Sequence, residues 1–175
     1  DDVAAGARDF IDSMGERAIS FLSDPSLGQE QRKTQFRKLL RDSYDMDTIA
    51  RFALGRYWRL ASAGQRKDYL KLFETMVVNV YARRFEDYKG QKFEVRGQRP
   101  DGDSDILVTS YIVPDDGSKV KVDWRVRYKG GKYRIVDVIV EGVSMAMTQR
   151  SDFSAVIQNG GGDVQVLIDH LKAQQ

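Results

Sequence analysis

The apolar residues of this chain change their spacing once, at Lys89-Gly90. Before that point they recur every three to four residues, as on the buried stripe of an amphipathic helix. From residue 92 to residue 141 they mostly alternate with polar residues, as on a strand with one buried face. Helices followed by a run of strands predict an α+β fold, in which several helices pack around an antiparallel sheet.

Four helical segments are expected before the change of spacing: 3–23, 27–44, a short helix that ends at Gly55, and 63–88. Ser26 with Gln29, and Ser62 with Gln65, have the spacing of a capping box at a helix start. The longest helix carries apolar residues over nearly half of its circumference. So wide an apolar face indicates contact with both the sheet and other helices.

Four strands are expected after the change of spacing: 92–98, 105–113, 119–129 and 132–141. The third strand alternates most clearly and places Trp124 on its apolar face. Gly130-Gly131 fits a two-residue hairpin loop into the fourth strand. A helix over 148–158 and a last helix capped by Asp163 follow the sheet.

The chain of 175 residues fits the usual size of one domain. We expect it to comprise a helical part (1–90), the sheet (91–141) and closing helices (142–175). No apolar run approaches the ~20 residues of a membrane span. The chain begins with Asp1-Asp2 rather than Met, as a protein does after removal of a signal peptide, and this predicts an exported protein.

Composition removes several classes of chemistry. The chain has no cysteine and one histidine, His170, so it can form no disulfide, thiol nucleophile or Cys/His metal site. A Ser-His-Asp triad would have to use His170. The net charge is +2, and the basic residues are spread over both halves of the chain. Without a basic tail or arm, the sequence does not predict a nucleic-acid partner.

The first candidate site is apolar. It comprises the Trp124 face of the third strand, the broad face of the longest helix, and Met145 and Met147 beyond the sheet. Such stripes usually form the core of a protein. The alternative is a cavity between helix and sheet for an apolar ligand, because methionine and aromatic side chains line adaptable apolar sites well.

The second candidate site is a basic hairpin, formed by Lys119, Lys121, Arg125, Arg127, Lys129, Lys132 and Arg134. One interpretation is a solvated outer face whose lysines also protect an edge strand. The other is a docking surface for anionic headgroups or an acidic protein partner. A binding module that only bridges membrane complexes through this hairpin is a further alternative.

The third candidate is Asp137, which lies within the apolar run Ile135–Val140. A carboxylate there is costly unless it is hydrogen-bonded or functional. It could be a general base in an apolar cone, an arrangement that ketosteroid isomerase uses. The interpretation we prefer is a structural carboxylate that accepts hydrogen bonds from a neighbouring loop or arginine.

Several runs of residues resemble the MlaC or toluene-tolerance auxiliary family. Its N-terminal half is similar to Leu54-Gly55-Arg56-Tyr57-Trp58, Gln65-Arg66 and Tyr88-Lys89-Gly90. Its C-terminal signature is similar to Asp123-Trp124-Arg125-Val126, Asp137–Met145 and Gly160–Gly162. The resemblance covers nearly the whole chain. One departure is Ala63-Gly64, where members often have proline after the capping Ser or Thr.

The resemblance implies a non-enzymatic periplasmic lipid-binding protein of a Gram-negative bacterium, with no catalytic residues, metal or cofactor. Members carry a phospholipid between an outer-membrane lipoprotein–porin complex and an inner-membrane ABC transporter. The implied partners are therefore phospholipid and these two complexes, with the carrier acting as a monomer. A related branch accompanies hopanoid biosynthesis and transport, so a hopanoid is the alternative cargo.

We therefore expect a cone-like fold with an apolar cavity between the helices and the four-stranded sheet. The residues predicted to bind lipid are Leu72, Met76, Val80, Tyr81, Val122, Trp124, Val126, Val138, Val140, Met145 and Met147. Glu141, Gly142, Val143 and Ser144 are predicted to shape the mouth of the pocket. Replacing Trp124 or Val126 by Asp is expected to lower lipid occupancy without unfolding the protein. The rival of another class is a cone-fold enzyme that uses Asp137.

Overall fold

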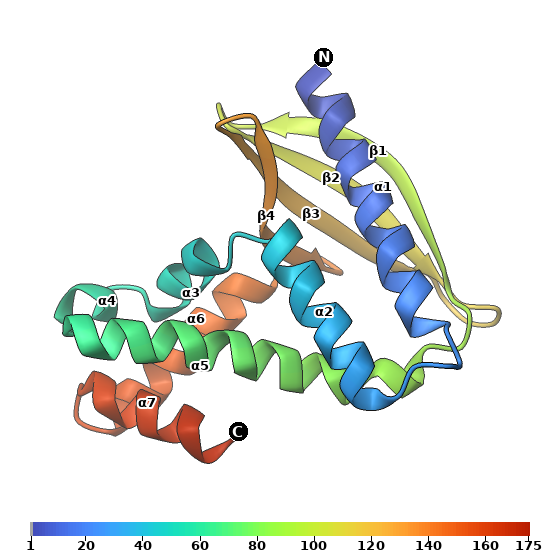
Figure 1. The fold of residues 1–175 in the computed structure, drawn as a ribbon. Coiled ribbons are helices and arrows are strands. Elements are labelled where there is room, and N and C mark those ends of the chain that lie inside the picture. The colour runs from blue at the N-terminus through green and yellow to red at the C-terminus, as the bar shows by residue number, and fades with distance from the viewer. Residues whose placement is uncertain (1) are drawn as a thin grey trace.

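The structure is a computed structural model that describes residues 2–175, and it places a group of helices beside an antiparallel sheet (Figure 1). The helices are α1 (Asp2–Leu22), α2 (Gln29–Ser43), α3 (Met46–Leu54), α4 (Tyr57–Leu60), α5 (Ala63–Ala82), the 3-10 helix η1 (Phe85–Asp87), α6 (Met145–Asn159) and α7 (Val164–Ala173). The strands are β1 (Lys92–Asp101), β2 (Asp105–Val113), β3 (Val120–Lys129), β4 (Lys132–Val140) and β5 (Val143–Ser144). The predicted α+β fold is confirmed. None of the helices within residues 2–175 has the length and hydropathy needed to cross a membrane.

The sheet has the order β1-β2-β3-β4-β5, and each neighbouring pair is antiparallel. It therefore has five strands rather than the four predicted. The extra strand follows a turn at Glu141 and Gly142, whose φ angles are 49° and 82°. This turn returns the chain so that Val143 pairs with Val140. A strand of two residues is too short to show alternation in a sequence.

Helix α1 lies along one face of the sheet (Figure 1). Its Ile11 is fully buried with Val108, Val126 and Ile135 of the three central strands. The apolar stripe of the helix and the alternating apolar residues of the strands thus form one core. This core fixes the position of the sheet face next to α1.

A second core joins α3, α4, α5, α6 and α7, away from the sheet. At its centre Tyr69 is fully buried, and its hydroxyl donates a hydrogen bond of 2.6 Å to the Ala50 carbonyl. Helix α2 contacts α1, α5 and β4, so it links the two groups. The space between the two cores is where the candidate site lies.

The helix starts follow the predicted capping pattern at one place and depart from it at another. Ser62 and Gln65 form the predicted box: each side chain accepts a hydrogen bond from the other residue's backbone N–H. The box predicted at Ser26 is wrong, because α2 begins at Gln29 and the Gly28 N–H donates to the Gln31 side chain instead. Ser26 is held by Asp24, to which both its N–H and its hydroxyl donate.

The longest helix is shorter than predicted, because α5 ends at Ala82 and not near Tyr88. The chain then turns through η1 toward β1, and Phe85 packs edge-on against Phe21 and Phe36, with ring centroids 6.2 and 5.4 Å away. Phe85 continues the helical spacing of apolar residues, so the sequence pattern did not reveal the turn. Helix α6 in turn begins at Met145, three residues before the predicted start.

Candidate apolar binding cavity

A cavity of about 570 Å³ lies between the sheet and the helices α1, α2 and α5. This volume falls within the roughly 300–1,000 Å³ of small-molecule sites in proteins. The wall is mostly apolar. The residues that line it include Ala18 (α1), Leu40 (α2), Met76 (α5), Trp124 (β3) and Val138 (β4). Because both cores contribute to the wall, the cavity exists only when the helical group and the sheet are held apart at this distance.

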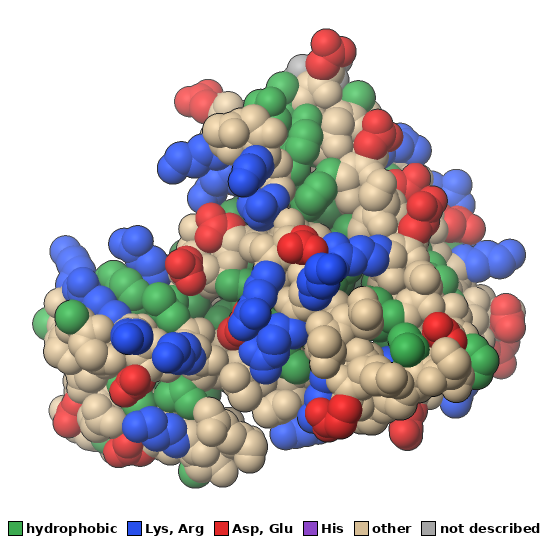
Figure 2. Space-filling model, viewed as in Figure 1, with side chains coloured by type: hydrophobic (Ala, Val, Ile, Leu, Met, Phe, Trp, Pro, Cys, Tyr) green, Lys and Arg blue, Asp and Glu red, His purple; other side chains and the backbone are tan. Residues whose placement is uncertain are grey.

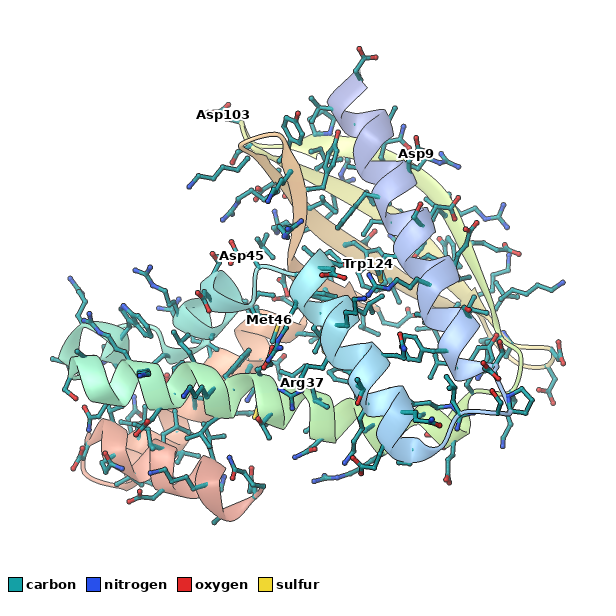
Figure 3. The ribbon with its side chains drawn as sticks, viewed as in Figure 1. Asp9, Arg37, Asp45, Met46, Asp103 and Trp124 are labelled. Atoms are coloured by element: carbon teal, nitrogen blue, oxygen red, sulfur yellow. The ribbon has the colours of Figure 1, made fainter. Side chains whose placement is uncertain are left out.

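Trp124 is fixed on the wall by its neighbours. Its indole Nε1 donates a hydrogen bond of 2.9 Å to Ser110 Oγ, and the fully buried Ser110 hydroxyl donates to the Val122 carbonyl. The ring also meets Phe93 edge-on at 6.0 Å. In Figure 3 the label of Trp124 lies between α1 and α2, in front of the sheet. The polar atom of the indole is thereby satisfied by the sheet, and the apolar ring is left to face the cavity.

Eight residues predicted to bind lipid lie on the cavity wall: Met76, Val80, Tyr81, Val122, Trp124, Val138, Val140 and Met145. Three others lie elsewhere. Leu72 is buried in the helical core, Val126 is fully buried against α1, and the side chain of Met147 is 57% exposed. The expectation that Val126→Asp leaves the protein folded is therefore corrected, because an unpaired carboxylate at a fully buried position is very costly.

The four residues predicted at the mouth do not line the cavity. Glu141 closes the turn before β5, and its carboxylate accepts a hydrogen bond of 2.7 Å from the Lys121 N–H. Ser144 caps α6 by accepting a hydrogen bond from the Met147 N–H. Gly142 and Val143 complete the same turn. The segment thus joins the sheet to α6 and lies beside the wall residues Val140 and Met145.

Charged side chains on the wall gather at one end. Arg84, Asp87 and Lys92 are exposed; the first two lie between α5 and β1, and Lys92 is the first residue of β1. We refer to these three residues as the charged rim. The other charged wall residue, Asp137, is engaged in hydrogen bonds. The exposed charges of the wall therefore lie at the charged rim, and the rest of the wall is mostly apolar.

Asp137 is the residue that the sequence left open between a catalytic and a structural role. Its carboxylate accepts hydrogen bonds from the Val138 N–H at 2.8 Å and the Ala146 N–H at 3.0 Å. The Ser144 hydroxyl also donates to it. Asp137 thus ties the first turn of α6 to β4, as the structural interpretation requires.

Two tyrosine side chains are the other polar groups of interest on the wall. Tyr44 follows the end of α2, and Tyr81 lies in the last turn of α5. Burial raises the pKa of both phenols. Tyr81 is nevertheless 43% exposed, and it lines the cavity.

The basic hairpin is partly neutralised within the sheet. Arg125 pairs with Asp101, Arg127 pairs with Asp105 at 2.8 Å, and Lys121 lies 3.9 Å from Asp123. Arg134 donates a hydrogen bond to the Tyr133 carbonyl, and the Lys119 ammonium lies over the Tyr111 ring. Lys129 and Lys132 are exposed at the hairpin turn. These ion pairs lower the net charge that the hairpin offers to a partner.

Sequence reasoning missed the walls that α1 and α2 contribute. Met14 and Ala18 of α1, and Phe36 and Leu40 of α2, line the cavity. Their helical spacing was visible, but the same spacing describes an ordinary core stripe. In the described part of the chain, no group of three or more acidic or histidine side chains could hold a metal ion.

Comparison with known proteins adds sequence and structural relatives. The family profile of the MlaC protein matches residues 12–173. The intermembrane phospholipid transport system binding protein MlaC of Haemophilus influenzae is 25% identical over 114 residues, which make up 63% of this chain and 53% of that protein. Toluene tolerance protein ttg2D of Pseudomonas putida is 22% identical over 156 residues, 85% of this chain and 73% of that protein. The alignment thus spans about half the length of the Haemophilus protein.

A solved structure has the same fold. The phospholipid-binding protein from Ralstonia solanacearum, in complex with a phospholipid, aligns with a TM-score of 0.81 and 22% sequence identity over 95% of both chains. The family profile covers nearly all of the sequence, including the runs of residues on which the resemblance rested. The chain therefore belongs to the MlaC family.

Proposed function

We propose that this protein is a periplasmic phospholipid carrier that holds the acyl chains of its cargo in the apolar cavity. The observation that carries the proposal is a cavity of about 570 Å³ whose wall is mostly apolar and whose exposed charges lie at the charged rim. This division matches an amphipathic ligand with apolar chains and a charged headgroup. The names of the Haemophilus and Ralstonia relatives support phospholipid as the cargo.

The energetics of a free lipid explain why a carrier needs such a cavity. Two acyl chains contain roughly 30 methylenes, and at ~0.8 kcal/mol each their exposure to water would cost roughly 20–25 kcal/mol. Spontaneous transfer between membranes is therefore very slow. A protein that replaces the bilayer with an apolar wall removes most of this cost, and it needs no catalytic residue, metal or cofactor to do so.

The transport route is part of the proposal. The carrier would act as a monomer between an outer-membrane lipoprotein–porin complex and an inner-membrane ABC transporter. The name of the Haemophilus relative, a binding protein of an intermembrane phospholipid transport system, supports this role. We place the headgroup at the charged rim, where Arg84 and Lys92 can contact a phosphate.

Two methionines of α6 provide a matched test of the cavity. Met145 lies on the wall, whereas Met147 is exposed, and both are in the first turn of the helix, where an acidic residue is favourable. Met145→Asp places a carboxylate among the acyl chains, so we expect lipid occupancy to fall at least about tenfold. Met147→Asp should leave it unchanged. Native mass spectrometry with lipid extraction, on protein purified from a bacterial periplasm, measures the occupancy.

The same measurement identifies the cargo. A phospholipid adduct supports the proposal, and a hopanoid adduct would assign the protein to the related branch. A lipid-free mass that persists after incubation with phospholipid vesicles would contradict the carrier function. Full occupancy in folded Met145→Asp protein would place the lipid outside this cavity.

A further inference from the structure

The hydroxyls of Tyr44 and Tyr81 have no hydrogen-bond partner among residues 2–175. Three other tyrosines are bonded: the hydroxyls of Tyr69, Tyr88 and Tyr133 donate to backbone carbonyls. Tyr81 is exposed and the Tyr44 hydroxyl is not fully buried, so both hydroxyls are open to the cavity and can donate a hydrogen bond to a ligand there.

Both tyrosines border the same space. Each lines the cavity, and Tyr81 also contacts the Phe36 ring at a centroid distance of 6.0 Å. Burial raises the pKa of Tyr44, and the charge that Tyr81 acquires on ionisation raises it further. Because that interaction depends on proximity, the two phenols lie within electrostatic reach of each other. Both therefore remain neutral hydrogen-bond donors at physiological pH.

The two tyrosines reach the cavity from different elements: Tyr44 follows the end of α2 and pairs with Ile135 of β4, and Tyr81 lies in the last turn of α5. Tyr81 precedes Arg84 of the charged rim by three residues, about one helical turn. The same wall carries apolar residues such as Trp124 and Met145. The wall of one cavity thus combines charged, hydrogen-bonding and apolar groups.

We infer that Tyr44 and Tyr81 form a polar subsite that donates hydrogen bonds to the ester carbonyl oxygens of a diacyl glycerophospholipid. This inference rests on the proposed carrier function. In such a lipid the polar atoms between the phosphate and the hydrocarbon chains are the ester oxygens, a few bonds from the phosphate. A lipid without acceptors there would leave two donors unsatisfied on the wall, and a site of this kind discriminates against such a ligand.

Competition between two lipids that differ only in these oxygens tests the subsite. Delipidated full-length protein is given equal amounts of a diester and a diether phosphatidylglycerol with matched hydrocarbon chains, and native mass spectrometry measures the ratio bound. Each hydrogen bond contributes a factor of about five, so we expect wild-type protein to prefer the diester by about tenfold or more. The double variant Tyr44→Phe/Tyr81→Phe should bind both lipids at a ratio near one.

Tyr88→Phe is the matched control. Tyr88 also lines the cavity, but its hydroxyl already donates to the Gln91 carbonyl at 3.1 Å, so its removal should leave the preference for the diester intact. Equal uptake of the two lipids by wild-type protein would overturn the subsite while leaving the carrier function standing. A preference that survives in the double variant would also overturn it. Failure of wild-type protein to take up either lipid would contradict the carrier function and the subsite together.

Discussion

Asp137 and Ser144 show how single residues hold the cavity wall in place. Asp137 accepts hydrogen bonds from the Ala146 N–H and the Ser144 hydroxyl, while Ser144 Oγ accepts one from the Met147 N–H. Both residues therefore satisfy backbone donors at the start of α6, which an uncapped helix would leave unpaired. Met145 and Ala146 of the same turn lie on the wall, so this cap positions part of the cavity.

Asp137→Ala should lower the free energy of unfolding by about 2–3 kcal/mol, and Ser144→Ala by about 1–2 kcal/mol, since each leaves backbone donors at the start of α6 without their side-chain acceptor. The double variant should cost less than the sum, because both changes remove the same hydrogen bond. Urea unfolding of the four proteins measures the coupling. Additive losses would mean that the two side chains act separately. In a separate assay, an enzymatic turnover that Asp137→Asn abolishes would support the rival function, a cone-fold enzyme that uses Asp137.

The sequence could not separate wall residues from core residues. Leu72 and Met76 are four residues apart on the same face of α5, yet Leu72 is buried in the helical core and Met76 lines the cavity. Both are apolar and both fit the helical stripe. Met76 packs against the same core but also borders the cavity, a difference that depends on the packed molecule and that spacing along one helix does not contain.

At the scale of elements, α2 is held against α5 by polar contacts as well as by packing. The Glu74 carboxylate of α5 accepts hydrogen bonds from Arg37 at 2.6 Å and from Arg41 at 2.8 and 2.9 Å. Figure 3 places Arg37 between the two helices. At the other end of α2, the Gln29 side chain donates to the Ala82 carbonyl. These contacts fix two walls of the cavity relative to each other.

The Glu74 cluster predicts a pH dependence of stability. The hydrogen bond from Arg41 is the largest cause that holds the pKa of Glu74 below its ordinary value of 4.5. A carboxylate whose pKa is lower in the folded state stabilises the protein above pH 4.5, and this contribution is lost as the pH falls through the folded pKa. We expect Glu74→Gln to lower the free energy of unfolding by about 1–2 kcal/mol at neutral pH, and the difference from wild type to shrink below pH 4.5.

Urea unfolding at a series of pH values measures this difference. Glu30→Gln is the control, because Glu30 is largely exposed and its carboxylate lies 3.6 Å from the Lys33 ammonium. It should change stability little at any pH. If the Glu74→Gln protein had the same free energy of unfolding as wild type at every pH, the ion pairs of Glu74 with Arg37 and Arg41 would contribute nothing to stability.

Element types followed from the spacing of apolar residues, whereas element ends depended on side-chain contacts. Alternation predicted β1 to β4, because one face of each strand is buried. The end of α5 was missed because Phe85 continues the helical spacing while its backbone belongs to η1. The start of α2 was missed because Asp24 binds Ser26, which was expected to cap the helix.

At the scale of the whole molecule, the residues that identify the family only partly coincide with the cavity wall: the runs around Trp124 and Asp137–Met145 contribute to it, whereas the Leu54–Trp58 run does not. In the Leu54–Trp58 run, Trp58 meets the guanidinium groups of Arg51 and Arg66, each 5.0 Å from the ring centre. Gly55 has a φ of 61°, and a Cβ there would approach Arg150 Nε to 3.0 Å. Figure 2 shows Lys and Arg side chains among hydrophobic ones at this α3–α4 end. The motif therefore maintains the helical core, and it identified the fold without identifying the wall.

A cavity between two cores also predicts that cargo stabilises the molecule as a whole. Lipid that binds only the folded protein adds about 4 kcal/mol to the free energy of unfolding at a free concentration about 1,000 times its Kd. Ala18→Trp would fill the cavity from α1, so we expect this variant to fold without lipid but to gain little stability from it. Ala5→Trp, at an exposed position of the same helix, should gain as much as wild type. Thermal unfolding with and without phospholipid measures the gain, and an undiminished gain in Ala18→Trp would mean that lipid binds outside the cavity.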